Sequence, residues 1–214
     1  MQYRDWEPTY EEILADFGFD RAKDEEAARI AAEILSRSDN KSEHVEQEIE
    51  RLIKGKAVII CGNAPCLVSD INGQAIFTAS RVVIAADGAT SVLLHKGIIP
   101  HIVVTDLDGN VADILYANRL GAVIVVHAHG DNIEMLRTVL PTLSGDVICT
   151  TQSKPIPKVY NFGGFTDGDR CVFLAKEFGA MEIVRLGFDF EDTEVSARKK
   201  KKLKWAKRLI GTIL

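Results

Sequence analysis

From residue 56 onward, the chain alternates short apolar runs, rich in β-branched residues, with segments long enough for helices. The runs are Ala57–Cys61, Arg81–Ala86, His101–Thr105, Ala122–His127, Val147–Thr150 and Glu182–Leu186. Continuous apolar runs suit strands that are buried on both faces. The segments between most of them have the length of βαβ crossover helices: Ala89–Lys96, Val111–Leu120, Ile133–Leu140 and Arg170–Phe178. The sequence therefore predicts an α/β fold with a Rossmann-like, doubly wound and mainly parallel sheet.

Two regions flank this core. Residues 1–54 contain apolar residues at helical spacing, such as Ile13, Leu14 and Phe17, and no convincing strand. We interpret them as an N-terminal helical accessory region whose last helix is capped by Asn40 or Ser42 and ends at Gly55. Residues 55–190 form the predicted catalytic core. Residues 191–214 form a closing amphipathic helix with a stripe made of Leu203, Ala206, Leu209 and Ile210.

Composition excludes several classes of function. The apolar stretches are far shorter than the roughly 20 residues of a membrane span, and the acidic N-terminus lacks the pattern of a secretory signal. A net charge of −5 argues against a nucleic-acid surface over the whole molecule. The four cysteines lack paired spacing, which favours a reducing compartment. We expect a cytoplasmic protein without membrane or nucleic-acid partners, and we interpret the basic run Arg198–Lys202 as a solvated helix face.

Polar residues and glycines follow the predicted strands. Because the carboxyl ends of parallel strands meet at one edge, ligands of open α/β sheets bind there. The segments that should meet at this edge are Cys61–Cys66, Ala86–Thr90, Thr105–Asn110, His127–Asn132 and Gly187–Asp189.

Asp106 and Asp108 are the strongest metal-binding candidates. Two residues apart in an extended strand end, their side chains project to the same side, and Asp87 from a neighbouring strand end completes a set of hard oxygen ligands for a divalent cation. The cation would also offset the repulsion between the carboxylates. The structural alternative is that Asp106 caps the next helix and that residues 108–110 form a turn.

Three further segments carry candidate binding residues. Gly62 and Asn63 lie in a turn that could offer backbone N–H groups to phosphate or could be only a tight turn. His129 and Asp131 are candidates for phosphate contact, although Asp131 could instead cap the next helix, and His127 and His129 lack the partners that zinc requires. The glycine-rich loop Asn161–Arg170 favours close approach to a ligand, with Thr166 or Asp167 as a helix cap and Arg170 as a phosphate partner. The segment Gln152–Lys158 is interpreted as an exposed arm.

Ala85–Ala89 and Pro100–Asn110, together with His127–Asn132 and Asn161–Asp169, resemble the archaeal 6-hydroxymethyl-7,8-dihydropterin pyrophosphokinases, which are themselves similar to thiamine pyrophosphokinases. The resemblance covers about residues 56–190. It implies Mg²⁺-dependent transfer of a diphosphoryl group from ATP to the hydroxymethyl oxygen of a reduced pterin, with AMP as the other product. Related proteins have G-x-G-P-S where Gly62–Cys66 stands here, so that Ala64 requires a negative φ and Cys66 lacks the hydroxyl donor.

The same resemblance implies roles for individual residues. Asp87, Asp106 and Asp108 would hold Mg²⁺ on the triphosphate, and Asp131 or Asp189 would accept the proton of the hydroxyl group. The residues implied to contact the co-substrate or to order around it are Gly62, Asn63, Gly88, His129, Asn132, Gly163, Gly164, Thr166, Asp167, Asp169 and Arg170.

Other readings remain open at this point. Thiamine is the rival acceptor, and D-x-D motifs also bind the metal-diphosphate of nucleotide-sugars in glycosyltransferases. A non-catalytic nucleotide-binding regulator would use residues 1–54 as an interaction layer. The sequence leaves open whether the product enters folate or methanopterin synthesis and whether the chain forms a homodimer.

Overall fold

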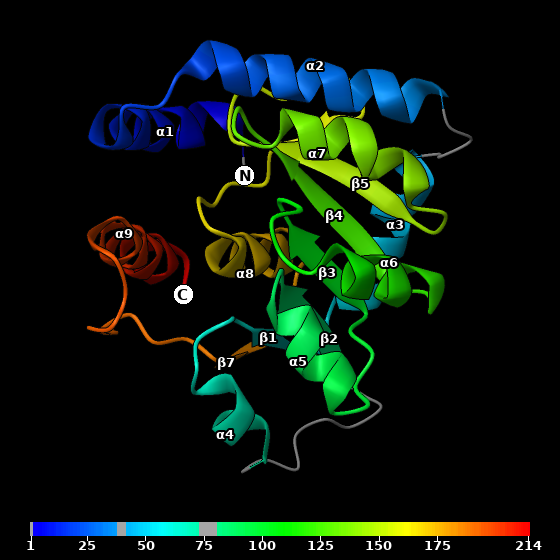
Figure 1. Cartoon of the computed structure of the whole chain (residues 1–214), viewed down its shortest axis with the longest axis vertical. Coiled ribbons are helices and arrows are strands. Elements are labelled where there is room, and N and C mark those ends of the chain that lie inside the picture. The colour runs from blue at the N-terminus through cyan, green and yellow to red at the C-terminus, as the bar shows by residue number, and fades with distance from the viewer. Residues whose placement is uncertain (1, 38–41, 73–80) are drawn as a thin grey trace.

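A single parallel sheet runs through the molecule (Figure 1). The computed structural model describes residues 2–37, 42–72 and 81–214. Within them, the seven strands have the order β6-β5-β4-β3-β2-β1-β7 and each neighbouring pair is parallel. The strands are β1 (Ala57–Cys61), β2 (Val82–Ala86), β3 (Ile102–Thr105), β4 (Val123–Ala128), β5 (Val147–Thr151), β6 (Val159–Tyr160) and β7 (Glu182–Leu186). The predicted α/β, Rossmann-like fold is confirmed.

Helices cover both faces of this sheet. They are α1 (Tyr3–Phe17), α2 (Arg21–Arg37), α3 (Ser42–Ile53), α4 (Leu67–Asn72), α5 (Ala89–His95), α6 (Val111–Arg119), α7 (Ile133–Thr138), α8 (Asp167–Glu177) and α9 (Ala197–Ile213), with a short 3₁₀ helix at Leu140–Thr142. Alternate strand residues point to opposite faces, so Ile59 and Cys61 pack with α2 and α4–α7. Val58 and Ile60 pack on the other face with α3 and α8.

The N-terminal helices are integral to these two cores. Ala27 and Ala31 of α2 are fully buried in the core on one face of the sheet, and Ile49 and Ile53 of α3 are fully buried in the core on the other face. Each of these helices supplies buried apolar surface to the sheet, and their separation as an accessory region stays a prediction. The domain boundaries at 54/55 and 190/191 stay predictions. Asn40 lies outside the described residues, as does the side chain of Ser42.

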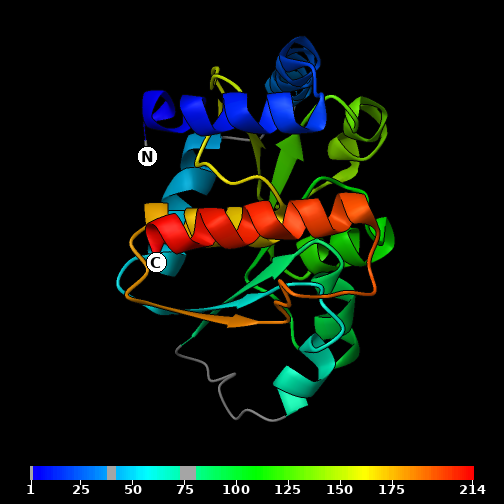
Figure 2. The same ribbon diagram turned by 90° about the vertical axis from the view of Figure 1, so that its left-hand side faces the viewer.

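Helices α1 and α9 lie side by side at one side of the molecule, although they come from opposite ends of the chain (Figure 2). The indole Nε1 of Trp205 donates a hydrogen bond of 2.7 Å to Asp16, and Arg208 pairs with Glu12 at 2.7 Å. Apolar residues of both helices share a third buried cluster with Phe165 and Phe173 from the region of α8. The predicted amphipathic helix is confirmed. Leu209 of its apolar stripe packs in this cluster with α1, and Ile210 packs in the core that contains α8.

Two segments add detail to the prediction. Helix α8 begins at Asp167, because Thr166, one of the two predicted caps, forms a capping box with Asp169. The segment from Gln152 to Lys158 is not simply an exposed arm, since Gln152 and Ser153 are buried. The indole of Trp6 donates to the Gln152 carbonyl at 2.8 Å, and this contact holds the start of the segment against α1.

All four cysteines lie within the described residues, and each is a free thiol. Cys61, Cys149 and Cys171 are buried free thiols, and Cys66 is a half-buried one. None of the helices in the described ranges is both long and apolar enough to cross a membrane.

Because α3 completes one core, Ile49→Ala is expected to lower the free energy of unfolding by about 2–5 kcal/mol. The matched control is Gln47→Ala on the exposed face of the same helix, which is expected to change it by less than about 0.5 kcal/mol. Urea unfolding followed by circular dichroism measures both values. Equal, small effects for the two variants would show that α3 contributes little to the stability of this core.

Candidate active site

A cleft of about 480 Å³ lies at the carboxyl edge of the sheet. The turns after β1, β2, β3, β4 and β7 line it, as the sequence predicts for an open parallel sheet. The link between α1 and α2, the start of α8 and one side of α9 complete the wall. All three segments of the predicted organisation therefore contribute to one cavity.

Asp87, Asp106 and Asp108 meet in this cleft. Each offers a carboxylate oxygen, and these atoms all lie within 4.8 Å of one another. Ala86 of β2 pairs with Val104 of β3, which places Asp87 next to Thr105. The hydroxyl of Thr105 donates to the Asp87 carboxylate and accepts from the backbone N–H of Leu107 at 2.8 Å. This hydroxyl joins the two strand ends that carry the acidic residues.

The acidic side chains converge through turns and not through an extended strand. Strand β3 ends at Thr105, and Leu107 has a φ of 68°, while Asp87 has a φ of 40°. Left-handed backbone at residues other than glycine is strained and is held by the structure around it. A Cβ at Gly109 would lie 2.2 Å from an Asp87 carboxylate oxygen, so glycine leaves the space that this carboxylate occupies. The expected reason for the convergence, an extended D-x-D, is therefore wrong, although the convergence itself is present.

The structural alternative for this segment is also wrong in its main element. Asn110, and not Asp106, is the N-cap of α6, with its side-chain oxygen accepting from the N–H of Ala112 at 3.2 Å. The carboxylate of Asp106 instead receives a hydrogen bond from His129. Asp106 is therefore free of a capping role and lines the cleft.

The electrostatics of the three carboxyl groups fit a divalent cation. Burial, followed by the charge of Asp106, raises the pKa of Asp108 to about 7. Burial also raises the pKa of Asp87. Burial alone would raise the pKa of Asp106, but the hydrogen bond from His129 and the charge of Arg170 lower it below its usual range. Such crowded carboxylates repel each other, and a hard cation bound by their oxygens removes this repulsion.

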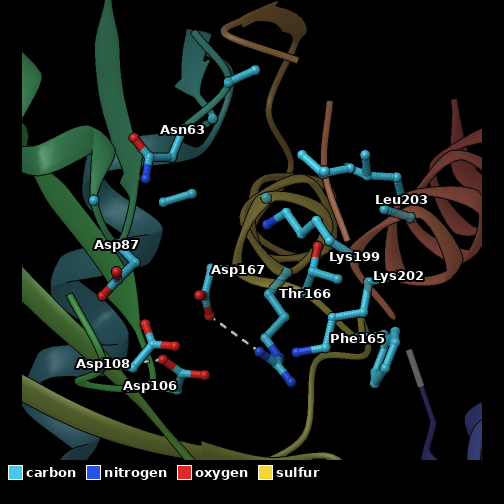
Figure 3. Close-up of a pocket in the computed structure, with 18 of the residues that line it drawn as sticks. Asn63, Asp87, Asp106, Asp108, Phe165, Thr166, Asp167, Lys199, Lys202 and Leu203 are labelled. Atoms are coloured by element: carbon cyan, nitrogen blue, oxygen red, sulfur yellow. Dashed lines mark hydrogen bonds and ion pairs between the residues drawn. The ribbon is translucent and has the colours of Figure 1, made fainter. Parts of the chain in front are cut away.

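Positively charged side chains face the acidic residues across the cleft (Figure 3). Lys199 and Lys202 extend from α9, and Arg170 extends from α8, where its guanidinium binds the carboxylate of Asp167 at 3.1 Å. Burial, followed by the charge of Arg170, lowers the pKa of Lys202. Burial, followed by the charge of Asp106, raises the pKa of Asp167. A ligand with several negative charges would neutralise the basic wall while sharing a cation with the acidic wall.

His129 is oriented as a hydrogen-bond donor to the acidic group. Its Nδ1 accepts from the backbone N–H of Asp131 at 3.3 Å, which assigns the proton to Nε2. Nε2 lies 3.3 Å from Oδ2 of Asp106. Both ring nitrogens of His129 therefore have partners within the protein. The Asp131 side chain is exposed at the rim of the cleft.

Four residues predicted to bind the co-substrate do not line the cleft. The amide of Asn132 is buried and donates to the carbonyls of Asp106 and His127, at 2.7 Å each. The Asp169 carboxylate is buried and accepts the N–H groups of Phe165 and Thr166 at 2.7 Å. The others are Gly163 and Gly164. A Cβ at Gly164 would lie 2.8 Å from the Cα of Arg170, so this loop packs behind the arginine. Their predicted contact with ligand is corrected to a role in holding the walls of the site.

The turn after β1 lines the cleft, but two of its backbone donors are not available to phosphate. The N–H of Gly62 donates to the Leu186 carbonyl at 2.8 Å, and that of Ala64 donates to the Gly187 carbonyl at 3.0 Å. These donors are used within the protein, since the turn is bonded to the end of β7. Ala64 is not among the residues with positive φ, as its Cβ requires. Cys66 is absent from the cleft lining, so the departure at this position leaves the wall unchanged.

The remaining predicted residues do line the cavity: Asn63, Gly88, Thr166 and Asp167. Sequence reasoning missed Lys199 and Lys202, because a basic run on an amphipathic helix is usually solvated. It also missed the lining residues Phe19, Lys23, Asp24 and Gln152. The three-residue spacing of the two lysines beside the apolar stripe was the available signal for α9. Nothing in the local sequence around Gln152 indicated burial.

The raised pKa of Asp108 predicts a pH-dependent effect of Asp108→Asn on the metal-free protein. The folded state binds this proton more tightly than the unfolded state, so the ionised carboxyl destabilises the fold above pH 7 and this cost fades as the pH falls toward 4. Because the side chain is exposed, the gain at pH 8 is discounted to about 1 kcal/mol, or about 2–4 °C in the unfolding temperature.

Thermal unfolding in EDTA from pH 4 to pH 8 measures this gain. Asp146→Asn is the matched control, because Asp146 is an exposed residue before β5, at the opposite edge of the sheet. A gain from Asp108→Asn that is the same at pH 4 and pH 8 would contradict the electrostatic explanation.

The fold has a distant counterpart among solved structures. A MAf glycosyltransferase from Magnetospirillum magneticum matches 80% of this chain with a TM-score of 0.51 and 16% sequence identity. The match spans 34% of that longer chain, so this protein corresponds to about a third of it. At this identity the likeness concerns the fold alone.

Relatives in sequence span nearly the whole chain. Proteins named 6-hydroxymethyl-7,8-dihydropterin pyrophosphokinase are 42% identical in Pyrococcus furiosus and 43% identical in Methanothermobacter thermautotrophicus, in each case over 98% of this chain and over 93% and 94% of the relatives. The protein of this name from Methanocaldococcus jannaschii is 38% identical over 99% of this chain and 95% of its own length. A family model described as 6-hydroxymethylpterin diphosphokinase MptE-like matches residues 35–195. The acidic cluster Asp87, Asp106 and Asp108 lies within the matched residues. The chain belongs to the MptE-like family.

Proposed function

We propose that this protein is a 6-hydroxymethyl-7,8-dihydropterin pyrophosphokinase that transfers a diphosphoryl group from ATP to the hydroxymethyl oxygen of the pterin. The observation that carries the proposal is the pairing of walls in one cleft, with Asp87, Asp106 and Asp108 opposite Arg170, Lys199 and Lys202. Family membership supplies the acceptor, since the curated relatives carry this name. The free thiols support a reducing compartment such as the cytoplasm as the place of the reaction.

Asp87, Asp106 and Asp108 would hold Mg²⁺ against the phosphate oxygens of ATP. The ion, when bound, would neutralise negative charge on the triphosphate and help to fix its orientation. Thr105 and Gly109 keep the Asp87 carboxylate in place, and His129 keeps that of Asp106 in place. These residues act by positioning, which supplies much of the catalysis in phosphoryl transfer.

The basic wall would stabilise the charge that shifts during transfer. The hydroxymethyl oxygen forms a bond to the β-phosphorus, and the bond between this phosphorus and the α,β-bridging oxygen breaks. AMP leaves with the electron pair, and the hydroxyl proton passes to a base. Lys199, Lys202 and Arg170 would contact the phosphate oxygens during this step.

We assign the base to Asp131. It is exposed at the rim of the cleft, and its backbone N–H binds His129, which in turn binds Asp106. His129 is not suited to this role, because its Nδ1 accepts from the Asp131 backbone and its Nε2 donates to Asp106. Asp189, which lines the cleft beyond β7, is the alternative base.

The direct test is an incubation of the purified protein with Mg²⁺, ATP and 6-hydroxymethyl-7,8-dihydropterin, with thiamine in a parallel reaction. We expect AMP and the pterin diphosphate in equal amounts, and no thiamine diphosphate. Product formed only with thiamine would reassign the acceptor. If no AMP is released with either acceptor, the pyrophosphokinase activity is refuted. A glycosyltransferase with this fold would form no AMP from ATP.

Asp106→Asn and Asp108→Asn are each expected to lower kcat by about 10³-fold or more, because each removes a carboxylate charge from the proposed cation site. The fold should persist, since neither side chain packs in a core. Asp146→Asn is the control for loss of one negative charge. Steady-state AMP release together with far-ultraviolet circular dichroism checks these expectations, and full activity in both variants would rule out the acidic cluster as the metal site.

Lys202→Met is expected to lower kcat/KM for ATP by about 10²-fold, because it removes a partly buried cation from the wall that faces the carboxylates. Lys204→Met changes an exposed lysine on the same helix and should stay within about twofold of wild type. Initial rates at varied ATP measure both. If the two variants behave alike, α9 contributes only its overall charge.

A further inference from the structure

The acidic cluster divides the cleft into two flanks. One flank lies beyond the ends of β1 and β7, where Gly62–Pro65 and Gly187–Phe190 line the wall. The other flank lies beyond the ends of β4 and β5, where His129 and Gln152 line the wall. The two flanks offer room for one substrate on each side of the acidic cluster.

The flank at β1 and β7 has the features of a nucleotide site. From β1 the chain proceeds through α4 to β2 on one side, whereas β7 reaches the other side of β1 after the crossover through α8. Helices α4 and α8 pack on opposite faces of the sheet, so the direction of winding switches at β1. Nucleotides bind in the crevice at such a switch point. The second substrate is therefore left with the flank at β4 and β5.

A buried network of hydrogen bonds builds the flank at β4 and β5. The carboxylate of Asp24 accepts the hydroxyl of Tyr10 at 2.7 Å and the side-chain amide of Gln152 at 2.9 Å. Its other oxygen accepts the backbone N–H of Gly130 at 2.9 Å. Asp24 and Gln152 are each 4% exposed. Helices α1 and α2 are thereby fastened to the loops after β4 and β5.

This network orients the carboxamide of Gln152. Its Nε2 is bound to Asp24, which assigns Oε1 as the remaining acceptor. Oε1 is buried and has no hydrogen-bond partner among the described residues, although Gln152 lines the cleft. A buried acceptor without a partner costs free energy, and a ligand N–H that reached it would recover that cost.

Two aromatic side chains, Phe19 and Phe165, also line the cleft, with ring centroids 6.3 Å apart. Arg198 lies over the Phe19 ring and Lys202 over the Phe165 ring, so a ligand would meet mainly the uncovered parts of these rings. The lining thus combines aromatic side chains with a fixed, neutral hydrogen-bond acceptor. A reduced pterin has the matching chemistry, because it is a planar, neutral ring whose 2-amino group and N3–H form an edge of adjacent donors.

We propose that the flank formed by Phe19, Phe165 and Gln152 is the subsite for the pterin ring, with Gln152 Oε1 accepting from the donor edge of the ring. Tyr10 and Asp24 are positioning residues that fix Gln152. The inference rests on the proposed function, and it adds the place of the acceptor and the residue that selects it. It also gives the N-terminal helices a part in substrate recognition.

The test measures binding of each substrate separately, with full-length protein and Mg²⁺. The pterin probe is 6-hydroxymethylpterin, followed by its fluorescence in the presence of α,β-methylene-ATP, which blocks transfer at the scissile bond. Calorimetry gives the affinity for α,β-methylene-ATP alone. Gln152→Leu is expected to weaken pterin binding at least about tenfold, with nucleotide affinity within about twofold of wild type. Phe19→Ala, at a partly buried position in the α1–α2 link, is a second variant with the same expected direction.

Phe188→Leu is the matched control on the opposite flank, where Phe188 lines the cleft beyond β7. It is expected to weaken the binding of α,β-methylene-ATP and to leave the affinity for the pterin unchanged. The subsite would be overturned if Gln152→Leu weakened nucleotide binding, weakened both affinities equally, or changed neither affinity. Wild-type protein that binds the nucleotide but not the pterin would instead refute the proposed function, and the subsite with it.

Discussion

The site depends on the parallel pairing of β2 with β3. Ala86 lies opposite Val104, so the residues that follow, Asp87 and Thr105, leave the sheet together. The Thr105 hydroxyl then links the Asp87 carboxylate to the backbone of Leu107. Two left-handed residues and one glycine turn the acidic side chains toward each other. Carboxylates brought together in this way repel, and the surrounding sheet holds them where a cation would relieve that repulsion.

Charge complementarity across the cleft depends on segments from both halves of the chain. The acidic wall comes from strand ends in the core, whereas Lys199 and Lys202 come from α9 near the C-terminus. Helix α9 is held in place partly by α1, through the contacts of Trp205 with Asp16 and of Arg208 with Glu12. The N-terminal helices in turn are fastened to the loops after β4 and β5 by Asp24. The N-terminal helices and α9, which the sequence sets apart from the core, thus help to build the walls of the cleft.

Particular residues show which features of the site could be predicted from the local sequence and which could not. The strand runs and the acidic residues after them were predictable, because buried strands need apolar runs and parallel strands share an edge. The roles of Asn132 and Asp169 could not be predicted, because a polar side chain in a loop can form hydrogen bonds either to a ligand or to the protein backbone. In both cases the hydrogen-bond partners lie within the protein. Likewise, the N–H groups of Gly62 and Ala64 are used by the end of β7, a segment more than a hundred residues away in the sequence.

The sequence by itself determined the fold class, the edge of the sheet that carries the site and the identity of its acidic cluster, because these follow from the periodicity of apolar residues and from what stands after each strand. Only the tertiary structure decided that α9 supplies two lysines of the basic wall, that Gln152 is buried with a free acceptor, and that His129 donates to Asp106. The physical reason is that burial, hydrogen-bond partnership and electrostatic environment are properties of contacts between distant segments. Local pattern fixes where a side chain stands on its own element, but not what it meets.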